Sequence, residues 1–329
     1  MIAECAVFTK NLNHIANETN LISKGITMNN FKKKALCAAI GATLMVPATS
    51  LMAAEVGNFF HTEGKSKLQI GLFYNDSKRD VEQKGKARVS SGVATETIIG
   101  EGETETTTEV GSVSGLKGEE NTQDLYLKIS YALTPKIEVY GKLGASQTDL
   151  DIDKANWQFD ESTTETDNPD IFNTSIVEPL DELETSSRGG DRGWLAGVGT
   201  KITIHETGSG WNLGLDGQYI YRDQDMDKSL AWGGDLELTG QESHELQGSL
   251  ILGKVVGNFR PYGGVSYTKY ESEYDLSEGG SRTGTIDLEN EDNVGYFAGF
   301  DFDFSGLTAS FEARGGDEEA FTFGLRMPL

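Results

Sequence analysis

The sequence predicts an all-β fold: a transmembrane, antiparallel, up-and-down β-barrel of about ten strands. Ten segments alternate apolar residues with small or charged ones, and this period of two places alternate side chains on opposite faces of a strand. The connections between these segments alternate between long and short. The chain also combines 40 Gly with a formal net charge of −24. A polar composition suits a barrel, because only every second strand residue faces lipid and the long loops face water.

The first five predicted strands each carry one apolar face. In the second of them, Leu125, Leu127, Ile129 and Tyr131 share a face. Strands of about 9–11 residues are long enough to cross a bilayer when they are tilted. The expected ranges of these strands are 67–75, 124–133, 137–146, 194–204 and 211–222.

The last five predicted strands repeat this pattern. Phe300, Phe302 and Phe304 share a face in one of them, and a Ser-Gly turn separates it from the next. Eight strands are an alternative to ten, and twelve are expected if residues 86–116 form an additional hairpin. The expected ranges are 244–254, 259–270, 294–304, 307–314 and 321–329.

The last eight residues resemble the C-terminal signature of bacterial outer-membrane β-barrels. Thr322 supplies its polar position, Gly324 its glycine, and Met327 and Leu329 its two apolar positions. The resemblance covers nearly the whole chain after residue 54 in architecture, includes small porin-like and opacity-type barrels, and selects no single family. It implies that these four residues form an assembly signal, that the barrel-assembly machinery is a partner, and that the protein lies in the outer membrane of a Gram-negative-type bacterium.

The alternation of connections predicts the topology. Outer-membrane barrels have short periplasmic turns, longer extracellular loops, periplasmic termini and an even number of strands. All of the excess negative charge after residue 54 lies in the long connections, so the cell exterior is expected to be acidic. This charge excludes nucleic acid as a partner by repulsion. The predicted extracellular loops are 77–121, 149–192, 223–242, 272–292 and 315–319.

The front of the chain is expected to be removed. Residues 28–54 read as a signal peptide, with three lysines, an apolar run and an Ala-Ala site; a membrane anchor is the alternative. Residues 1–27 read as an upstream, mis-annotated extension, with a genuine extension as the alternative. Both cysteines, Cys5 and Cys37, fall in this part. The barrel domain, residues 55–329, would therefore lack thiolate catalysis and thiolate metal sites.

The inward face of the predicted barrel carries bases and acids in nearly equal number. Unpaired charges in a narrow interior are costly, so an ion-pair network that plugs the barrel is expected. A narrow polar pore is the functional alternative. The predicted lumen-lining residues are Lys67, Lys128, Glu138, Lys142, Lys201, Asp216, Arg222, Glu245, Arg260, Asp301, Asp303, Glu312, Arg314 and Arg326, with Asp124 on the same face.

Two acidic runs predict cation sites at the outer ends of strands. Carboxylates spaced by two on an extended chain point the same way, and hard oxygen ligands favour Ca²⁺ or Mg²⁺. Such ions could bridge to lipopolysaccharide phosphates, so outer-membrane lipid and lipopolysaccharide are expected partners. The alternative is a strand that simply extends into water. The residues are Asp149, Asp151, Asp153, Asp223, Asp225 and Asp227.

Aromatic residues near the strand ends predict girdles at the two membrane interfaces. Such rings anchor a barrel where the bilayer meets water. The residues are Tyr74, Tyr131, Trp194, Trp211, Tyr219, Tyr221, Tyr267 and Tyr296.

The sequence does not predict an enzyme. Omptin proteases are ten-stranded outer-membrane barrels that use an Asp-Asp pair and a His-Asp pair at the extracellular rim. After residue 54 this chain has only His61, His205 and His244. His61 precedes the barrel, His205 lies at a periplasmic turn, and His244 shares its face with lipid-facing leucines.

Two functions are compatible with these patterns. The first is a porin-like passive channel for small cations or polar solutes. The second is a surface adhesion or interaction protein, in which long acidic loops on a plugged barrel bind an extracellular ligand.

Overall fold

The computed structural model describes residues 67–89, 95–98, 104–165, 172–178, 185–186, 192–229, 236–278 and 281–329. The predicted extension (1–27), the predicted signal peptide (28–54) and His61 lie outside these residues. Within the described part of the chain, no helix is long and apolar enough to cross a membrane.

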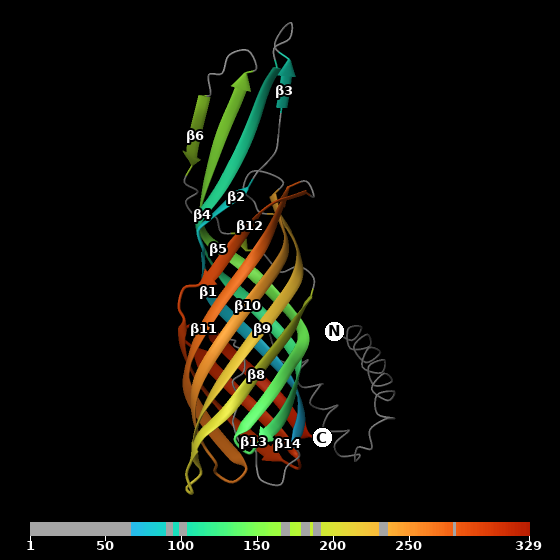
Figure 1. The fold of residues 1–329 in the computed structure, drawn as a ribbon, viewed down its shortest axis with the longest axis vertical. Helices are drawn as coiled ribbons and strands as arrows, with labels where there is room; N and C mark the ends of the chain where they lie inside the picture. Colours follow the sequence, from blue (N-terminus) through green and yellow to red (C-terminus); the bar gives the residue numbers. More distant parts are fainter. Residues whose placement is uncertain are drawn as a thin grey trace, which may run out of the picture. The chain divides into compact units, whose positions relative to one another are not determined.

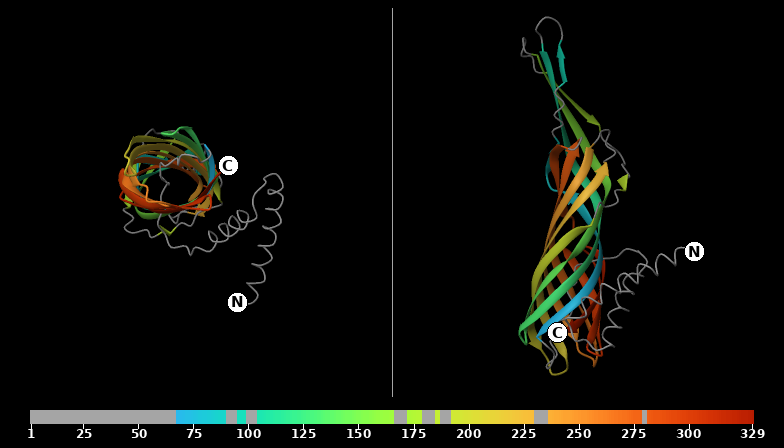
Figure 2. Two further views of the ribbon diagram at one scale, coloured as in Figure 1. Left: turned by 90° about the horizontal axis from the view of Figure 1, so that it is seen from below. Right: turned by 90° about the vertical axis from the view of Figure 1, so that its right-hand side faces the viewer.

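Ten strands form a closed antiparallel ring (Figures 1 and 2). The first strand pairs with the second ring strand on one side and with the last on the other, which closes the barrel. The predicted fold class and the count of ten ring strands are confirmed. The ring consists of β1 (Leu68–Gln83), β4 (Thr104–Thr134), β5 (Ile137–Glu165), β8 (Gly193–Glu206), β9 (Trp211–Ser229), β10 (Leu236–Lys254), β11 (Phe259–Glu278), β13 (Val294–Phe304), β14 (Leu307–Gly315) and β15 (Glu319–Pro328).

The barrel has the inside-out pattern of a membrane-spanning barrel. On β4, Leu125, Leu127 and Ile129 are 45–51% exposed, whereas Asp124 and Lys128, which have the opposite parity, are 2% exposed. An outward apolar face of this kind requires lipid around it. The predicted girdle aromatics lie on this outward face: six are exposed, and Tyr74 and Tyr221 are half-buried.

Tight turns join the strands at one end of the barrel. They connect β4 to β5, β8 to β9, β10 to β11 and β13 to β14, as expected for the periplasmic side. Gly210 and Gly306 have φ values of 83°, a conformation that glycine adopts without strain. These residues explain why the turns are so short.

At the other end, the strands run much farther than predicted. β4 has 31 residues and β5 has 29, and their pairing continues from Thr134↔Ile137 to Glu105↔Glu165. Large parts of the segments predicted as loops are therefore strand. The polar Thr- and Glu-rich sequence has no apolar face, but Thr favours extended backbone and pairing satisfies the backbone groups.

Four short strands flank this β4–β5 extension and do not enter the ring. β2 (Lys86–Val89) and β3 (Thr95–Ile98) pair with β4, whereas β6 (Phe172–Glu178) and β7 (Thr185–Ser186) pair with β5. The additional hairpin considered for residues 86–116 thus adds no strands to the barrel wall. We call β3, β6 and the paired residues 104–114 and 156–165 the ribbon.

A further strand, β12 (Ser281–Asn290), closes the wall where three ring strands end. β15 pairs with β1 up to Lys78, and β12 then pairs with β1 at Val81–Gln83. On the other side, β13 pairs with β11 up to Tyr267, and β12 pairs with it from Glu271. Above this level the wall is built from β1, β4, β5, β9, β10, β11 and β12, so the barrel narrows.

The wall between β5 and β9 is closed by a side chain where β8 begins. β5 pairs with β8 only up to Ser146↔Gly193. Just above, the Gln224 amide donates to the Thr148 carbonyl at 2.8 Å and accepts from the Thr148 N–H at 2.7 Å. Gln224 therefore replaces one step of the missing β ladder.

We expect Gln224→Ala to lower the free energy of unfolding by about 1–3 kcal/mol, because two buried backbone groups lose their partner. Urea unfolding of the refolded protein in detergent measures this loss. Gln123→Ala is the control, since Gln123 is exposed. Equal losses for the two variants would contradict the proposed role of Gln224.

Candidate functional site in the barrel interior

The interior of the ring is filled with charged side chains that contact one another. Eleven of the predicted lumen residues are at most 8% exposed. Glu138 and Asp303 are half-buried and Lys67 is exposed. In an open, water-filled pore, the lining side chains would be accessible to water. The eleven are Lys128, Lys142, Lys201, Asp216, Arg222, Glu245, Arg260, Asp301, Glu312, Arg314 and Arg326.

Three arginines form most of the ion pairs in the part of the interior that lies farther from the tight turns, which we call the upper part. Arg222 lies between Asp124 (3.0 Å) and Glu245 (3.2 Å). Arg79 pairs with Glu318 at 2.6 Å and lies 3.6 Å from Glu245. Together with Arg314, these residues form what we call the arginine network.

The loop between β14 and β15 folds into the arginine network. Its Glu318 accepts bonds from Arg79 at 2.6 Å and from Arg314 at 3.0 Å. Arg314 also donates to Glu312 at 3.1 Å. Burial raises the pKa of the Glu318 carboxyl to about 7, although both guanidinium groups favour its charged form. The loop thereby ties together β1 and β14, the two strands that flank β15.

Sequence reasoning missed Arg79 and Glu318, because both lie in segments predicted as extracellular loops. Arg79 has the same parity as Asn75 and Ser77, which are buried on the inward face of β1. Extending the alternation of β1 beyond residue 75 was the signal that could have found it. Glu318 follows no strand pattern, and the sequence gives no signal for its inward fold.

The lower part of the interior has two further groups of charges. Arg260 pairs with Asp303 at 2.7 Å and lies 3.7 Å from Asp301, which also pairs with Arg326. These contacts link β11, β13 and β15 near the tight turns.

A tyrosine lies at the centre of the second group. The Nζ atoms of Lys128, Lys142 and Lys201 lie 4.3–5.7 Å from the centre of the Tyr140 ring. The Tyr140 hydroxyl donates to Asp216 at 3.1 Å. The face of the Tyr140 ring and the Asp216 carboxylate therefore both stabilise the three lysine ammonium groups.

Above the arginine network, the narrowed barrel is filled by an apolar cluster that we call the apolar cap. Its members come from all seven strands that continue there, and each is at most 3% exposed. All of them except Tyr270, which ends the predicted strand 259–270, lie in segments that the sequence predicted as loops. The members are Val81, Val113, Leu116, Leu150, Ile152, Met226, Leu238, Tyr270, Tyr274, Leu276, Ile286 and Leu288.

One predicted assembly-signal residue has a packing role. Gly324 lies against the buried Phe73 ring, and a Cβ at this position would be 2.1 Å from that ring. The Phe73 ring in turn stacks on Tyr126 at 5.5 Å. A side chain at position 324 would therefore displace an interior aromatic pair.

We expect Gly324→Ala to destabilise the folded barrel by about 1–3 kcal/mol through overpacking. Gly217→Ala is the control, since nothing lies within 4 Å of a Cβ there. The measurement is the midpoint of urea unfolding, followed by the gel-mobility shift of the folded barrel. If Gly324→Ala and Gly217→Ala unfold at the same urea concentration, the close contact between position 324 and the Phe73 ring does not determine the stability of the barrel.

The predicted cation sites are not assembled as metal centres. Asp149, Asp151 and Asp223 are half-buried, and Asp153 and Asp225 are exposed. The side chain of the sixth, Asp227, is outside the described part. Within that part, no group of three or more His, Cys, Asp or Glu residues could hold a metal ion. Binding of Ca²⁺ or Mg²⁺ stays a prediction.

The two described histidines lie on the outside of the barrel. His244 is exposed, and its Nδ1 lies 2.7 Å from the Tyr219 hydroxyl. Its ring packs at 5.1 Å from Tyr221. His205 is exposed near the tight turn between β8 and β9. His244 therefore belongs to the outer aromatic girdle, as its parity predicted.

No family model and no curated protein matches the chain. Among solved structures, an outer-membrane channel from Pseudomonas putida F1 is 13% identical, with a TM-score of 0.31 over 83% of this chain and 98% of that chain. The translocator domain of the autotransporter NalP from Neisseria meningitidis is 11% identical, with a TM-score of 0.35 over 97% and 99%. A Pseudomonas aeruginosa FadL homologue is 10% identical, with a TM-score of 0.25 over 80% and 90%. At these values, the fold assignment rests on the strand pairing of the chain itself.

Proposed function

We propose that the protein is an outer-membrane β-barrel that serves as a closed scaffold and presents the ribbon at the cell surface. The observation that carries this proposal is the filled interior: the arginine network and the apolar cap occupy successive levels of the lumen. This favours the surface interaction protein over the passive channel among the two predicted functions. The exposed apolar belt and the girdles support the membrane location.

The ribbon is the part that a ligand outside the cell would meet. Its β4 and β5 residues continue the barrel ladder from Ser114↔Asn156 to Glu105↔Glu165 (Figure 1). Residues 104–114 and 156–165 contain no Lys or Arg but several Glu, Asp and Thr. A rigid wall that continues into a polar sheet suits a binding surface held by a scaffold. Under this proposal, the ligand of the ribbon is a second molecule or surface outside the cell.

The passive channel requires a continuous water path, which the interior does not favour. Opening one would separate buried ion pairs such as Arg222–Asp124, and a charge that stays buried without its partner costs about 3–5 kcal/mol. The side chains of the apolar cap belong to strands of the barrel wall and not to a separate plug segment. The cap therefore cannot swing out of the lumen as a plug on a hinge could. A closed resting state follows from both features.

Single-channel recording in a planar bilayer tests the closed scaffold. We expect the refolded protein to insert and to stay electrically silent. Discrete conductance steps would contradict the proposal and restore the channel.

Surface proteolysis tests the display of the ribbon. Val89↔Gly111 and Phe159↔Ile176 are paired residues, so residues 90–110 and 160–175 can each be replaced by an Asn-Gly turn. We expect protease added to intact cells to trim the full protein and to spare this shortened one. Equal resistance of both proteins would exclude an exposed ribbon.

A further inference from the structure

The loop between β14 and β15 turns two neighbouring acids into the barrel. Residues 316–318 belong to no strand, so they lie outside the sheet ladder. Asp317 and Glu318 are each 3% exposed, whereas Gly316 before them and Glu319 after them are exposed. The loop therefore lies at the solvent-accessible surface on both sides of the two buried acids. We call Asp317 and Glu318 the acid pair.

Two consecutive glycines give this loop a hinge. Gly315 ends β14, and Gly316 has a φ of 104°, a conformation that glycine adopts without strain. The Asp317 carboxyl packs against Gly295 of β13, where a Cβ would overlap it. Rotation about the two glycines would carry the acid pair out to water without unpairing a strand.

The acid pair has charged partners inside the barrel. One Glu318 oxygen accepts from Arg79 at 2.6 Å, and the other accepts from Arg314 at 3.0 Å. Burial raises the pKa of the Asp317 carboxyl above its ordinary value, although Thr268 and both arginines favour its charged form. The charged and titratable groups that face the acid pair or its partners are Arg79 on β1, Arg222 on β9, Glu245 on β10, Tyr270 on β11, and Glu312 and Arg314 on β14.

Buried acids outnumber buried bases at this level of the lumen. Five carboxyl groups surround three guanidinium groups, which leaves an excess of two negative charges if every carboxyl is ionised. An uncompensated buried charge is costly, and a buried carboxyl that lacks compensation takes up a proton instead. The acids are Asp124, Glu245, Glu312, Asp317 and Glu318, and the bases are Arg79, Arg222 and Arg314.

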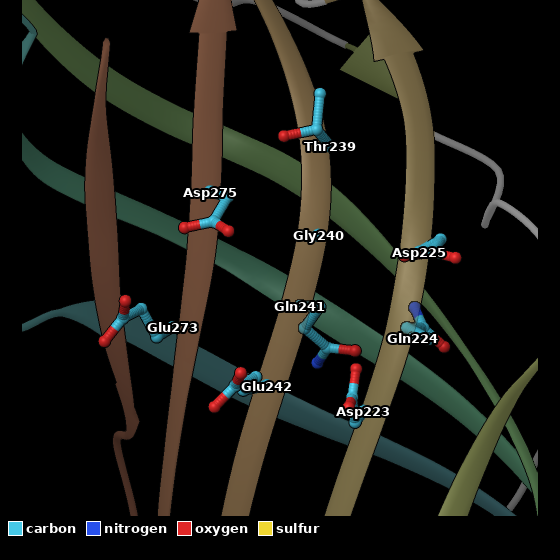
Figure 3. Close-up of a pocket in the computed structure, with 9 residues that line it drawn as sticks. All are labelled: Asp223, Gln224, Asp225, Thr239, Gly240, Gln241, Glu242, Glu273 and Asp275. Atoms are coloured by element: carbon cyan, nitrogen blue, oxygen red, sulfur yellow. The ribbon is translucent and has the colours of Figure 1, made fainter. Parts of the chain in front are cut away.

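Acids on the outer face of the barrel have a different environment. A hollow of about 360 Å³ at the outer ends of β9, β10 and β11 is also lined by several acids (Figure 3). Asp225, Glu242 and Glu273 of this hollow are exposed, so water and salt screen their repulsion. The acid pair has no such access to water while the loop is folded inward, so its charge must be compensated inside the barrel.

We propose that the β14–β15 loop is a proton-dependent latch. The loop stays folded into the lumen while the acid pair holds one proton, and it turns outward when that proton is lost. Both acids ionise freely in water, so the inward conformation is the one that binds the extra proton. The apolar cap and the lower ion pairs do not involve this loop, so the barrel stays closed in both conformations. The latch does not depend on the function proposed for the ribbon.

Linkage gives the direction of the pH dependence. Burial raises the pKa of Glu318 from an ordinary 4.5 to about 7. Between these values the inward conformation binds more protons than the outward one. The stabilisation by this proton is therefore fully present below pH 4.5 and is lost as the pH rises to about 7. The latch is firm in acid and loosens toward neutral pH.

Carbodiimide labelling of carboxyl groups in the refolded full chain, read residue by residue by mass spectrometry, tests the latch. Glu319 is the internal reference, because it is exposed beside the acid pair. We expect the labelling of Glu318 relative to Glu319 to rise on the order of fiftyfold between pH 5 and pH 7.5. Labelling of Asp317 should rise in parallel, because both acids move with the loop.

Neutralising either acid should remove this pH dependence. In Asp317→Asn the labelling of Glu318, and in Glu318→Gln the labelling of Asp317, should change at most about twofold over the same range, since one buried charge is already gone. Asp225→Asn is the control, because it changes the net charge equally on the outer face. The gel-mobility shift of the folded barrel verifies that every variant is folded before labelling.

Three results would overturn the latch. Equal relative labelling of the wild-type acid pair at both pH values would mean that the loop does not move. An unchanged pH dependence in both Asp317→Asn and Glu318→Gln would place the proton on another acid of the arginine network. Loss of the pH dependence in Asp225→Asn would mean that the net charge of the barrel, and not the acid pair, controls the loop.

Discussion

Replacing Arg222 by methionine is expected to lower the free energy of unfolding by about 3–5 kcal/mol, one of the largest effects of a single substitution in this barrel. Arg222 is 4% exposed and donates to Asp124 on β4 and to Glu245 on the neighbouring strand β10. Its removal leaves the Asp124 carboxylate without its arginine in an interior shielded from water. Glu245 keeps Arg79 at 3.6 Å, so Asp124 accounts for most of the loss.

Urea titration in detergent micelles measures this effect against Lys78→Met. Lys78 pairs with Glu119 on the outer surface, and its side chain is 37% exposed. A solvent-exposed pair contributes about 0–1 kcal/mol, so the control should be nearly neutral.

Adding Asp124→Asn to Arg222→Met should recover part of the loss, since the uncompensated charge is then removed. A double variant that is less stable than Arg222→Met would show that Asp124 has other essential partners. Ser146 is the neighbour that such a result would implicate, because its hydroxyl donates to Asp124 at 2.7 Å.

The membrane-spanning half of the fold could be predicted because one physical rule governs it. Lipid outside and packed polar groups inside force a period of two, so Leu125 and Lys128 could be assigned to opposite faces from sequence. The turns could be placed because Gly210 and Gly306 adopt positive φ. The strand ranges of the lower barrel follow from these two signals.

The outer half could not be predicted in the same way, because no lipid imposes an apolar face there. The distal parts of β4 and β5 are polar on both faces, and their pairing comes from backbone hydrogen bonds. The apolar cap also reverses the local rule: Leu276 and Leu288 point inward, whereas apolar residues at membrane level point outward. A period of two identifies such strands but not which face is inside.

The residues of the candidate site divide in the same way, into those that the alternation of the strands predicted and those that it did not. Predicted lumen residues such as Arg222 and Glu245 meet in the interior, because parity fixes the face and narrowness forces contact. Arg79 and Glu318 escaped prediction because β1 continues and a loop folds inward. The acidic runs at Asp149 and Asp223 were predicted as separate sites. The register instead joins Asp223 with acids of two other strands.

The second large effect is expected in the apolar cap. Leu238→Ala and Leu276→Ala should each lower the free energy of unfolding by about 2–5 kcal/mol, since both residues are fully buried and their truncation leaves a cavity. The measurement is again urea unfolding, now combined with planar-bilayer recording of the same variants. Leu246→Ala is the control, because Leu246 is 58% exposed on the outer face.

Planar-bilayer recording of the cap variants shows whether the apolar cap only stabilises the barrel or also keeps it closed to ions. The arginine network lies below the cap and does not depend on Leu238, so the truncated barrels should stay electrically silent while they unfold more easily. Conductance that appears in Leu238→Ala alone would mean that the apolar cap blocks ion flow and that the arginine network beneath it already admits ions. If Leu238→Ala shows no conductance and Arg222→Met does, the arginine network would instead be the level that blocks ion flow. Because the two levels are built from different residues of largely the same strands, single substitutions test each level without removing the other.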